Sequence, residues 1–114
     1  MLKKNRIKDL HVKNLSQLVD PHSILHHKED LLAYDCDGFT IHRHLPKAVV
    51  FPQNTKQVSS IVKYCNENDL PFLARGAGTG LSGGAIPLNN EVVISLVKMK
   101  RLLSVDYQNR RAVV

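Results

Sequence analysis

A run of glycines offers the clearest chemistry in this sequence: RGAGTGLSGGA, from Arg75 to Ala85. Five of the six glycines in the 114-residue chain lie within it. Glycine lets a backbone approach a ligand closely and adopt positive φ, and successive N–H groups can then form a concave anion site. A tight turn alone needs only one or two glycines, so this density predicts a phosphate-binding loop.

Two familiar phosphate loops do not fit this run. The stretch Gly78–Gly83 matches GxGxxG, but that dinucleotide fingerprint must open a helix and be followed by an acidic residue about 20 positions later. Here Pro87 follows closely, and Lys98 stands near the acidic position. The P-loop pattern requires a lysine where Gly84 stands. The sequence therefore predicts a phosphate loop of a third kind.

A strand–helix–strand unit precedes this loop and must position it. The runs AVVF at 48–51 and PFLA at 71–74 are typical of short buried strands. A helix between them begins at Asn54 or Thr55 and ends near Asn68. Its apolar stripe has helical spacing and consists of Val58, Ile61, Val62 and Cys65. Such a unit usually forms a parallel strand pair with the helix laid across it.

The flanking segments complete an α+β chain. Residues 12–33 predict two short helices separated at Pro21, with Asp20 or Ser23 as possible caps. Residues 35–40 predict a loop and residues 91–96 a third strand. Residues 102–114 predict a hairpin with its turn at Gln108 and Asn109.

Composition narrows the class of protein. Apolar residues make up 43% and charged residues 23%, as in soluble globular proteins. No apolar stretch approaches the ~18 residues of a membrane span, and no signal peptide is predicted. Two cysteines, Cys36 and Cys65, are too few for a disulfide scaffold, and we expect both to be reduced thiols. We expect the six histidines to lie at the surface and not to bind a metal ion.

The net charge of +6 is concentrated at the two ends of the chain. Basic residues gather in 1–13 and again in 98–111. Basic ends can bind nucleic acid, but no aromatic residues interleave with the first cluster and no nucleic-acid motif is present. A solvated or partner-facing surface is the preferred interpretation, and a nucleic-acid-binding module is a low-ranked alternative.

The loop and its flanks resemble a known family. The stretch PKAVVFPQNTKQVSSIVKYCNENDLPFLARGAGTGLSGGAIPL is similar to the start of the FAD-binding domain in the vanillyl-alcohol oxidase superfamily. YDCDGF at 34–39 and VKMKRLLSVDYQNRRAVV narrow the resemblance to FAD-linked catalytic subunits of bacterial glycolate oxidases. The implied α+β fold has N-terminal helices followed by the first α/β subdomain of a PCMH-type FAD-binding domain, truncated in the next β-sheet. Residues 1–41 would form the helical segment and 42–114 the incomplete FAD-binding part.

The resemblance implies FAD as the cofactor. The pyrophosphate would be held by the first part of the loop, and the second part would run toward the ribityl chain and flavin. The implied contacts are Gly76, Ala77, Gly78, Thr79, Gly80, Ser82, Gly83 and Gly84. Several superfamily members carry a flavin-bonding histidine in this loop, whereas Thr79 occupies that position here. We therefore expect non-covalent FAD. We also expect Gly78→Val to block the phosphate's approach.

The resemblance further implies oxidation of a small 2-hydroxy acid, glycolate to glyoxylate, with D-lactate dehydrogenases as a related alternative. The implied catalytic and metal-binding residues lie beyond Val114, so we expect no catalytic side chain in this chain. A truncated fragment without independent activity is the competing reading. Implied partners are a second FAD-binding-like subunit and an iron–sulfur subunit. The implied location is cytoplasmic, with peripheral attachment to the inner membrane through those partners as an alternative.

Overall fold

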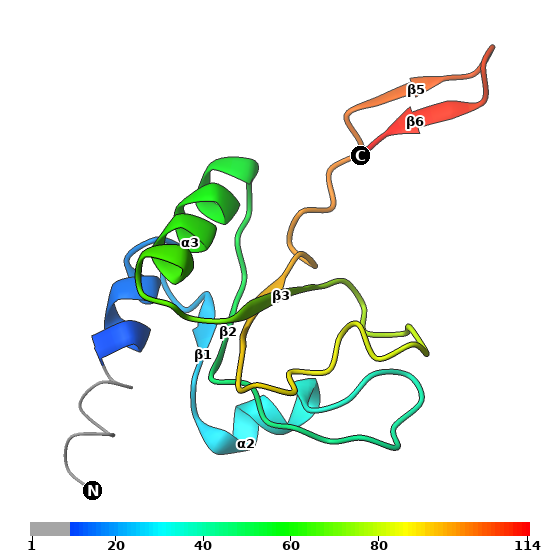
Figure 1. Ribbon diagram of the computed structural model, residues 1–114. Helices are drawn as coiled ribbons and strands as arrows, with labels where there is room; N and C mark the ends of the chain where they lie inside the picture. Colours follow the sequence, from blue (N-terminus) through cyan, green and yellow to red (C-terminus); the bar gives the residue numbers. More distant parts are fainter. Residues whose placement is uncertain (1–9) are drawn as a thin grey trace, which may run out of the picture.

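A four-stranded mixed sheet forms the centre of the computed structural model, which describes residues 10–114 (Figure 1). Its strands are β1 (Ile24–Leu25), β2 (Ala48–Val50), β3 (Phe72–Arg75) and β4 (Val92–Ser95). Their order is β1-β2-β4-β3, with β2, β4 and β3 parallel and β1 antiparallel to β2. The three strands predicted around the helix and loop are thus confirmed. The two that flank the helix are parallel but not adjacent, because β4 pairs between them.

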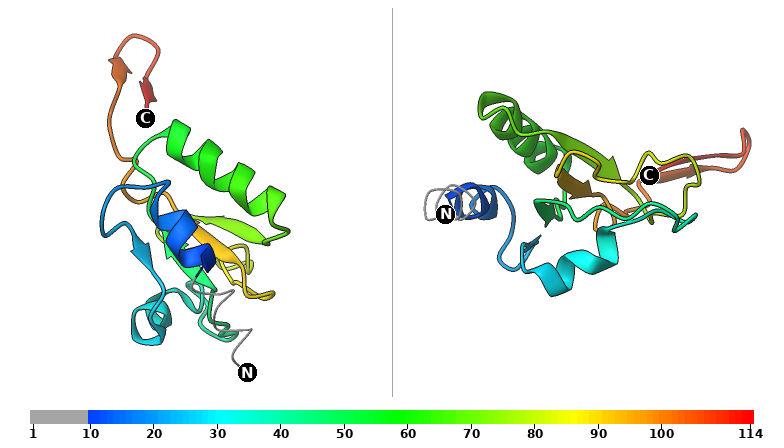
Figure 2. Two further views of the ribbon diagram at one scale, coloured as in Figure 1. Left: turned by 90° about the vertical axis from the view of Figure 1, so that its left-hand side faces the viewer. Right: turned by 60° about the horizontal axis from the view of Figure 1, so that its bottom comes forward.

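The two central strands supply the core. Every residue of β2 and β4 is buried, as expected for parallel strands covered on both faces. Alternate side chains enter two clusters: Val50, Val92 and Ile94 pack in one, whereas Val49 and Val93 pack in the other. The sheet therefore has a packed layer on each face, with α3 on one side and α2 on the other (Figure 2).

Helix α3 (Thr55–Glu67) covers the first face. The side chain of Asn54 accepts a hydrogen bond from the backbone N–H of Gln57 at 3.0 Å, so Asn54 is the N-cap that the sequence predicts. Ile61 and Cys65, from the predicted stripe, are fully buried beneath it. The helix ends at Glu67 with Asn68 as its C-cap, and Asp69 follows with φ of 50° in the left-handed region.

The N-terminal segment differs in part from its prediction. Residues 10–16 are helical, and Leu15 is buried in the same cluster as α3. Ile24 and Leu25, however, form a strand where a helix was expected, because they pair with the otherwise open edge of the buried β2. Ser23 caps no helix; its side-chain oxygen accepts a hydrogen bond from Lys98 Nζ at 2.8 Å.

The second face of the sheet carries α2 (Lys28–Leu31) and the short 3-10 helix η1 (Leu32–Tyr34). Leu31 is buried there, and the aromatic ring of Tyr34 packs edge-on against Phe51 with ring centroids 5.9 Å apart. These elements confirm the α+β class. The division of the chain at residue 41 stays a prediction, and the basic cluster at 1–13 lies largely outside the described residues.

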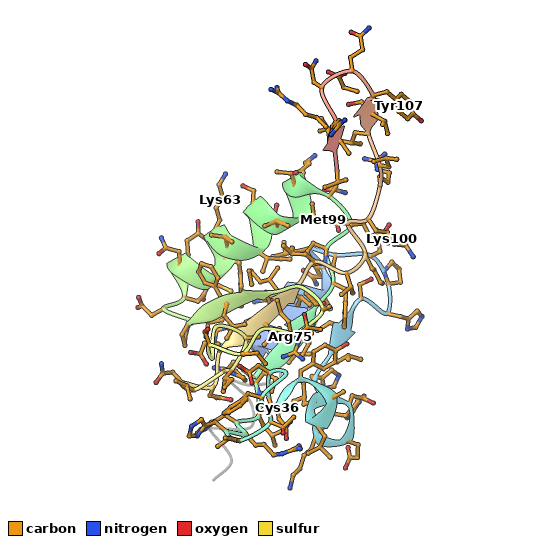
Figure 3. All side chains as sticks on the ribbon, turned by 90° about the vertical axis from the view of Figure 1, so that its right-hand side faces the viewer. Cys36, Lys63, Arg75, Met99, Lys100 and Tyr107 are labelled. Carbon is orange, nitrogen blue, oxygen red and sulfur yellow. The ribbon has the colours of Figure 1, made fainter. Side chains whose placement is uncertain are left out.

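The predicted C-terminal hairpin is confirmed and stands away from the sheet. Strands β5 (Ser104–Asp106) and β6 (Arg111–Val113) pair antiparallel, and every residue in both is exposed. The turn includes the predicted Asn109, whose backbone N–H and side-chain amide both donate to the carboxylate of Asp106. Figure 3 shows Tyr107 near the tip of the hairpin, far from the glycine loop.

Candidate functional site

The glycine loop follows β3 directly and leaves the sheet at the carboxyl ends of its parallel strands. That edge is where open α/β sheets bind ligands. All of the predicted contact residues lie on this one continuous stretch of chain, 76–84. Most of them are exposed, and Gly78 and Gly83 are half-buried. The structure therefore presents the predicted residues together on one accessible surface.

Several backbone N–H groups of this loop are available as hydrogen-bond donors. Within residues 10–114, no hydrogen bond is made by the backbone N–H groups of residues 77–82. Consecutive free N–H groups on an exposed glycine-rich turn can bind an anionic oxygen. The N–H of Gly83 is different, because it donates to the Asp37 carboxylate at 3.0 Å. Residues 77–82 are thus the part of the loop that is available to a phosphate.

The glycines of the loop fall into two groups. Gly78 has φ of 74° and Gly83 has φ of 83°, which side chains rarely adopt. At Gly76, Gly80 and Gly84, φ is ordinary and a Cβ would meet no neighbouring atom within 4 Å. The chain's own packing does not explain glycine at these three positions, whereas the close approach of a ligand does.

Arg75 supports the loop from below. It is 8% exposed, and its Nη1 donates to the carbonyl oxygens of Cys36 at 2.8 Å and of Ala85 at 3.4 Å. Its guanidinium also lies over the Tyr34 ring, 5.4 Å from the centroid. Figure 3 shows Arg75 and Cys36 in the same part of the molecule. A Cβ on Gly78 would overlap this guanidinium, so the reason given above for Gly78→Val changes: the side chain would strike Arg75.

Arg75 also affects the electrostatics of the loop. Among residues 10–114 it forms no ion pair; the pair found there joins Arg43 to Asp35 at 3.3 Å. A buried guanidinium bonded only to neutral carbonyl groups keeps its full positive charge beneath the free N–H groups. This charge favours an anion at the loop. The sequence pattern does not reveal it, because the burial of Arg75 depends on contacts with residues distant in the chain, such as Cys36.

Segment 35–39 packs against the glycine loop, and the two lie side by side (Figures 1 and 2). Asp37 is 5% exposed and accepts hydrogen bonds from the N–H groups of Phe39 at 2.9 Å and Gly83 at 3.0 Å. The bond from Phe39, followed by that from Gly83, holds the pKa of Asp37 below its usual value despite burial. The carboxylate is therefore ionised at neutral pH.

A hollow of about 270 Å³ lies where segment 35–39 meets the loop. Asp37, Phe39, Leu81 and Ser82 are among the residues that line it. The predicted contact Ser82 thus faces a concave surface beside the free N–H groups. The side chains of Thr79 and Ser82 make no hydrogen bond within residues 10–114, and both are exposed.

Two negative observations concern the described residues. Within 10–114, no three His, Cys, Asp or Glu side chains gather into a group that could hold a metal ion. No helix in the same range combines the length and apolar character needed to cross a membrane.

The fold and the loop together define the class of protein. Residues 46–114 match the family model described as the FAD binding domain, so the chain belongs to that family. FAD is its cofactor, and the loop fits this group because three glycines leave open space beside unpaired N–H donors. When bound, FAD supplies a flavin that accepts two electrons.

Particular relatives are similar to different extents. Glycolate oxidase subunit GlcD of Escherichia coli K12 is 42% identical over 89 residues, 78% of this chain and 18% of that protein. D-lactate dehydrogenase of Archaeoglobus fulgidus is 49% identical over 65 residues, 57% of this chain and 14% of that protein. D-2-hydroxyglutarate dehydrogenase of Stutzerimonas stutzeri is 34% identical over 102 residues, which are 90% of this chain and 22% of that protein. The chain thus spans about a fifth or less of these relatives.

Solved structures agree with the fold. p-Cresol methylhydroxylase with bound substrate superimposes with a TM-score of 0.71 at 27% identity, covering 86% of this chain and 20% of that one. Alkyldihydroxyacetonephosphate synthase superimposes with a TM-score of 0.79 at 18% identity, covering 91% of this chain and 21% of that one. At this identity the likeness supports the fold alone. The expected resemblance to PCMH-type FAD-binding domains is confirmed.

Proposed function

We propose that residues 76–80 hold the pyrophosphate of FAD through their backbone N–H groups, and that Ser82, Gly83 and Gly84 continue toward the ribityl chain and flavin. The observation that carries this proposal is the open space at Gly76, Gly80 and Gly84, which the chain itself does not use. The N–H groups of residues 77–82, which make no hydrogen bond within the described part of the chain, supply the donors. Arg75 adds positive charge beneath them.

The test uses a side chain that the protein tolerates and the ligand does not. A Cβ at Gly80 would meet no neighbouring atom within 4 Å, so Gly80→Val should leave the thermal unfolding midpoint unchanged. It should raise the Kd for FAD by at least about tenfold, measured by flavin fluorescence. Ala74→Val, at an exposed position of β3, is the matched control and should bind FAD normally. Wild-type affinity in Gly80→Val would overturn the assignment.

We further propose that the flavin is not covalently bound to this loop. Thr79 offers no imidazole at the position where some superfamily members attach the flavin, and its side chain is exposed. Acid precipitation of the flavin-loaded protein should leave all flavin in the supernatant. A loop peptide that carries the mass of a flavin would contradict this.

For the whole protein we propose oxidation of a small 2-hydroxy acid, with glycolate as substrate and glyoxylate as product. Three relatives named above, for glycolate, D-lactate and D-2-hydroxyglutarate, share this substrate class. In this proposal residues 1–114 bind and orient FAD and contribute no catalytic side chain. Dye reduction by the flavin-loaded protein from its native source, with the three acids compared, tests the substrate; faster turnover of D-lactate would overturn glycolate.

The second candidate function is that of a fragment with no activity of its own. Two observations favour it: the chain spans only 18% of the length of GlcD, and every residue of the two hairpin strands is exposed. Residues 1–114 would then be a truncated fragment that binds FAD weakly and has no activity of its own. For the whole protein, the proposed partners are a second FAD-binding-like subunit and an iron–sulfur subunit. Tight FAD binding with glycolate turnover by the isolated chain would exclude this candidate.

A further inference from the structure

Segment 35–39 and the glycine loop are joined by hydrogen bonds at three points. Gly83 N–H donates to Asp37, Gly38 N–H donates to Gly80 O at 3.0 Å, and Arg75 donates to Cys36 O. We propose that Asp37 and Gly38 are positioning residues that hold the loop in the shape that binds FAD. This inference rests on the proposed function, and it adds a part of the site outside the glycine run.

The bond between Gly38 and Gly80 orients one donor of the loop. A trans peptide places its C=O and its N–H on opposite sides, and no cis peptide occurs among residues 10–114. Because the Gly80 carbonyl faces Gly38, the Leu81 N–H of the same peptide faces away from segment 35–39. Leu81 is exposed, and its N–H makes no hydrogen bond to any of residues 10–114. The bond from Gly38 thus points the Gly80 carbonyl oxygen toward segment 35–39 and leaves the Leu81 N–H on the opposite side of the loop, which we call the ligand side.

The bond between Asp37 and Gly83 has the opposite effect on the next part of the loop. With the Gly83 N–H held by the carboxylate, the Ser82 carbonyl of that peptide faces away from segment 35–39. The ligand side then offers an N–H at Leu81 followed by a C=O at Ser82. A backbone donor suits a phosphate oxygen, and a backbone acceptor suits a hydroxyl group.

Close approach of the two backbones requires glycine at position 38. A Cβ there would lie 2.8 Å from the carbonyl oxygen of Thr79 and 3.2 Å from that of Gly80. Real Cβ atoms do not approach backbone oxygen so closely, so Gly38→Ala would push both peptides away. The loop would lose its preorganised shape, and FAD would have to restore it on binding.

The Asp37 carboxylate can be tested by an isosteric change. In Asp37→Asn, one oxygen becomes an NH₂ group, so a donor faces either the Phe39 or the Gly83 N–H. Asp35→Asn is the matched control: Asp35 is also 5% exposed and lies in the same segment, but its carboxylate pairs with Arg43 rather than with the loop.

We expect Asp37→Asn to raise the Kd for FAD by about tenfold or more, and Asp35→Asn by less than about threefold. Gly38→Ala should weaken FAD binding as Asp37→Asn does. In the absence of FAD, amide hydrogen exchange at Gly83 should accelerate in Asp37→Asn and not in Asp35→Asn. Wild-type FAD affinity in a folded Asp37→Asn variant would overturn the inference.

The two measurements separate the inference from the function on which it rests. If the wild-type chain does not bind FAD, the proposed function fails, and amide exchange alone decides whether Asp37 holds the loop. If wild type binds FAD while Asp37→Asn shows unchanged exchange at Gly83 and unchanged affinity, the positioning role fails and the proposed function stands.

Discussion

The glycine loop and the β5–β6 hairpin are both exposed, but they are supported in opposite ways. The loop is held by hydrogen bonds that reach back 39 and 46 positions, to Cys36 and Asp37. The hydrogen bonds of the hairpin stay within residues 103–113. The chain therefore determines the shape of its candidate site through long-range contacts, whereas every residue of the two hairpin strands is exposed.

Gly78→Val should damage the loop most. The new side chain would meet the buried Arg75 guanidinium and would resist φ of 74°, so we expect the free energy of unfolding to fall by at least about 3 kcal/mol, with loss of FAD. Gly76→Val is the control for stability, since its Cβ meets no neighbouring atom within 4 Å and its φ is ordinary. Thermal unfolding of both variants measures the difference. Equal midpoints would mean that Arg75 does not support Gly78.

Arg75→Met should have an intermediate effect. Methionine keeps an apolar stem of similar length but leaves the carbonyl groups of Cys36 and Ala85 without their donor, which should cost about 1 to 3 kcal/mol of stability. Arg111→Met removes an exposed arginine from strand β6 of the hairpin, so its cost should be below about 0.5 kcal/mol. Denaturant unfolding compares the two variants; a larger loss in Arg111→Met would contradict the contrast.

Lowering the pH should weaken the hydrogen bonds of Asp37 at the glycine loop and those of Asp106 in the hairpin independently of each other. The pKa of Asp37 is lowered chiefly by the Phe39 N–H, and that of Asp106 by the Asn109 side chain. A lowered folded-state pKa means that the stabilising contribution is complete above the unfolded value of 3.8 and disappears as pH falls through the folded value. NMR titration should show Gly83 shifting with Asp37 and the hairpin turn shifting with Asp106. A Gly83 signal that follows Asp106 would show that the regions are coupled.

Changes within the hairpin should matter least. Val105 is 43% exposed and Tyr107 is 87% exposed, so Val105→Thr or Tyr107→Ala should alter the free energy of unfolding by less than about 0.5 kcal/mol. Loop variants should remain unaffected by either change, because distant sites add independently. A loss above about 1 kcal/mol in a denaturant titration would mean that the hairpin contributes to the core after all.

Periodicity and turn chemistry predicted much of this fold. The stripe from Val58 to Cys65 and the cap at Asn54 are local signals, and α3 follows them. Strand β1 was missed because its formation depends on pairing with β2, which no local pattern encodes. The insertion of β4 between β2 and β3 is non-local for the same reason.

The candidate site was predicted in part. Glycine density located the loop, and the positive φ of Gly78 agrees with the expected conformation. The support from Asp37, Gly38 and Arg75 was not foreseen, although two signals were available. One was the single glycine outside the run, Gly38; the other was the pair of aspartates beside it at 35 and 37. Their meaning depends on a contact across more than 40 positions, which spacing alone does not reveal.

The position of β4 also determines the order in which the chain acquires its shape during synthesis. β2, α3 and β3 leave the ribosome first, yet β2 and β3 have no direct ladder between them and meet only through β4. Until residues 92–95 emerge, β3 has no partner strand, so the loop that follows it has no fixed base. The glycine loop is therefore a late product of folding, and its contacts are of the long-range kind that slow folding rates.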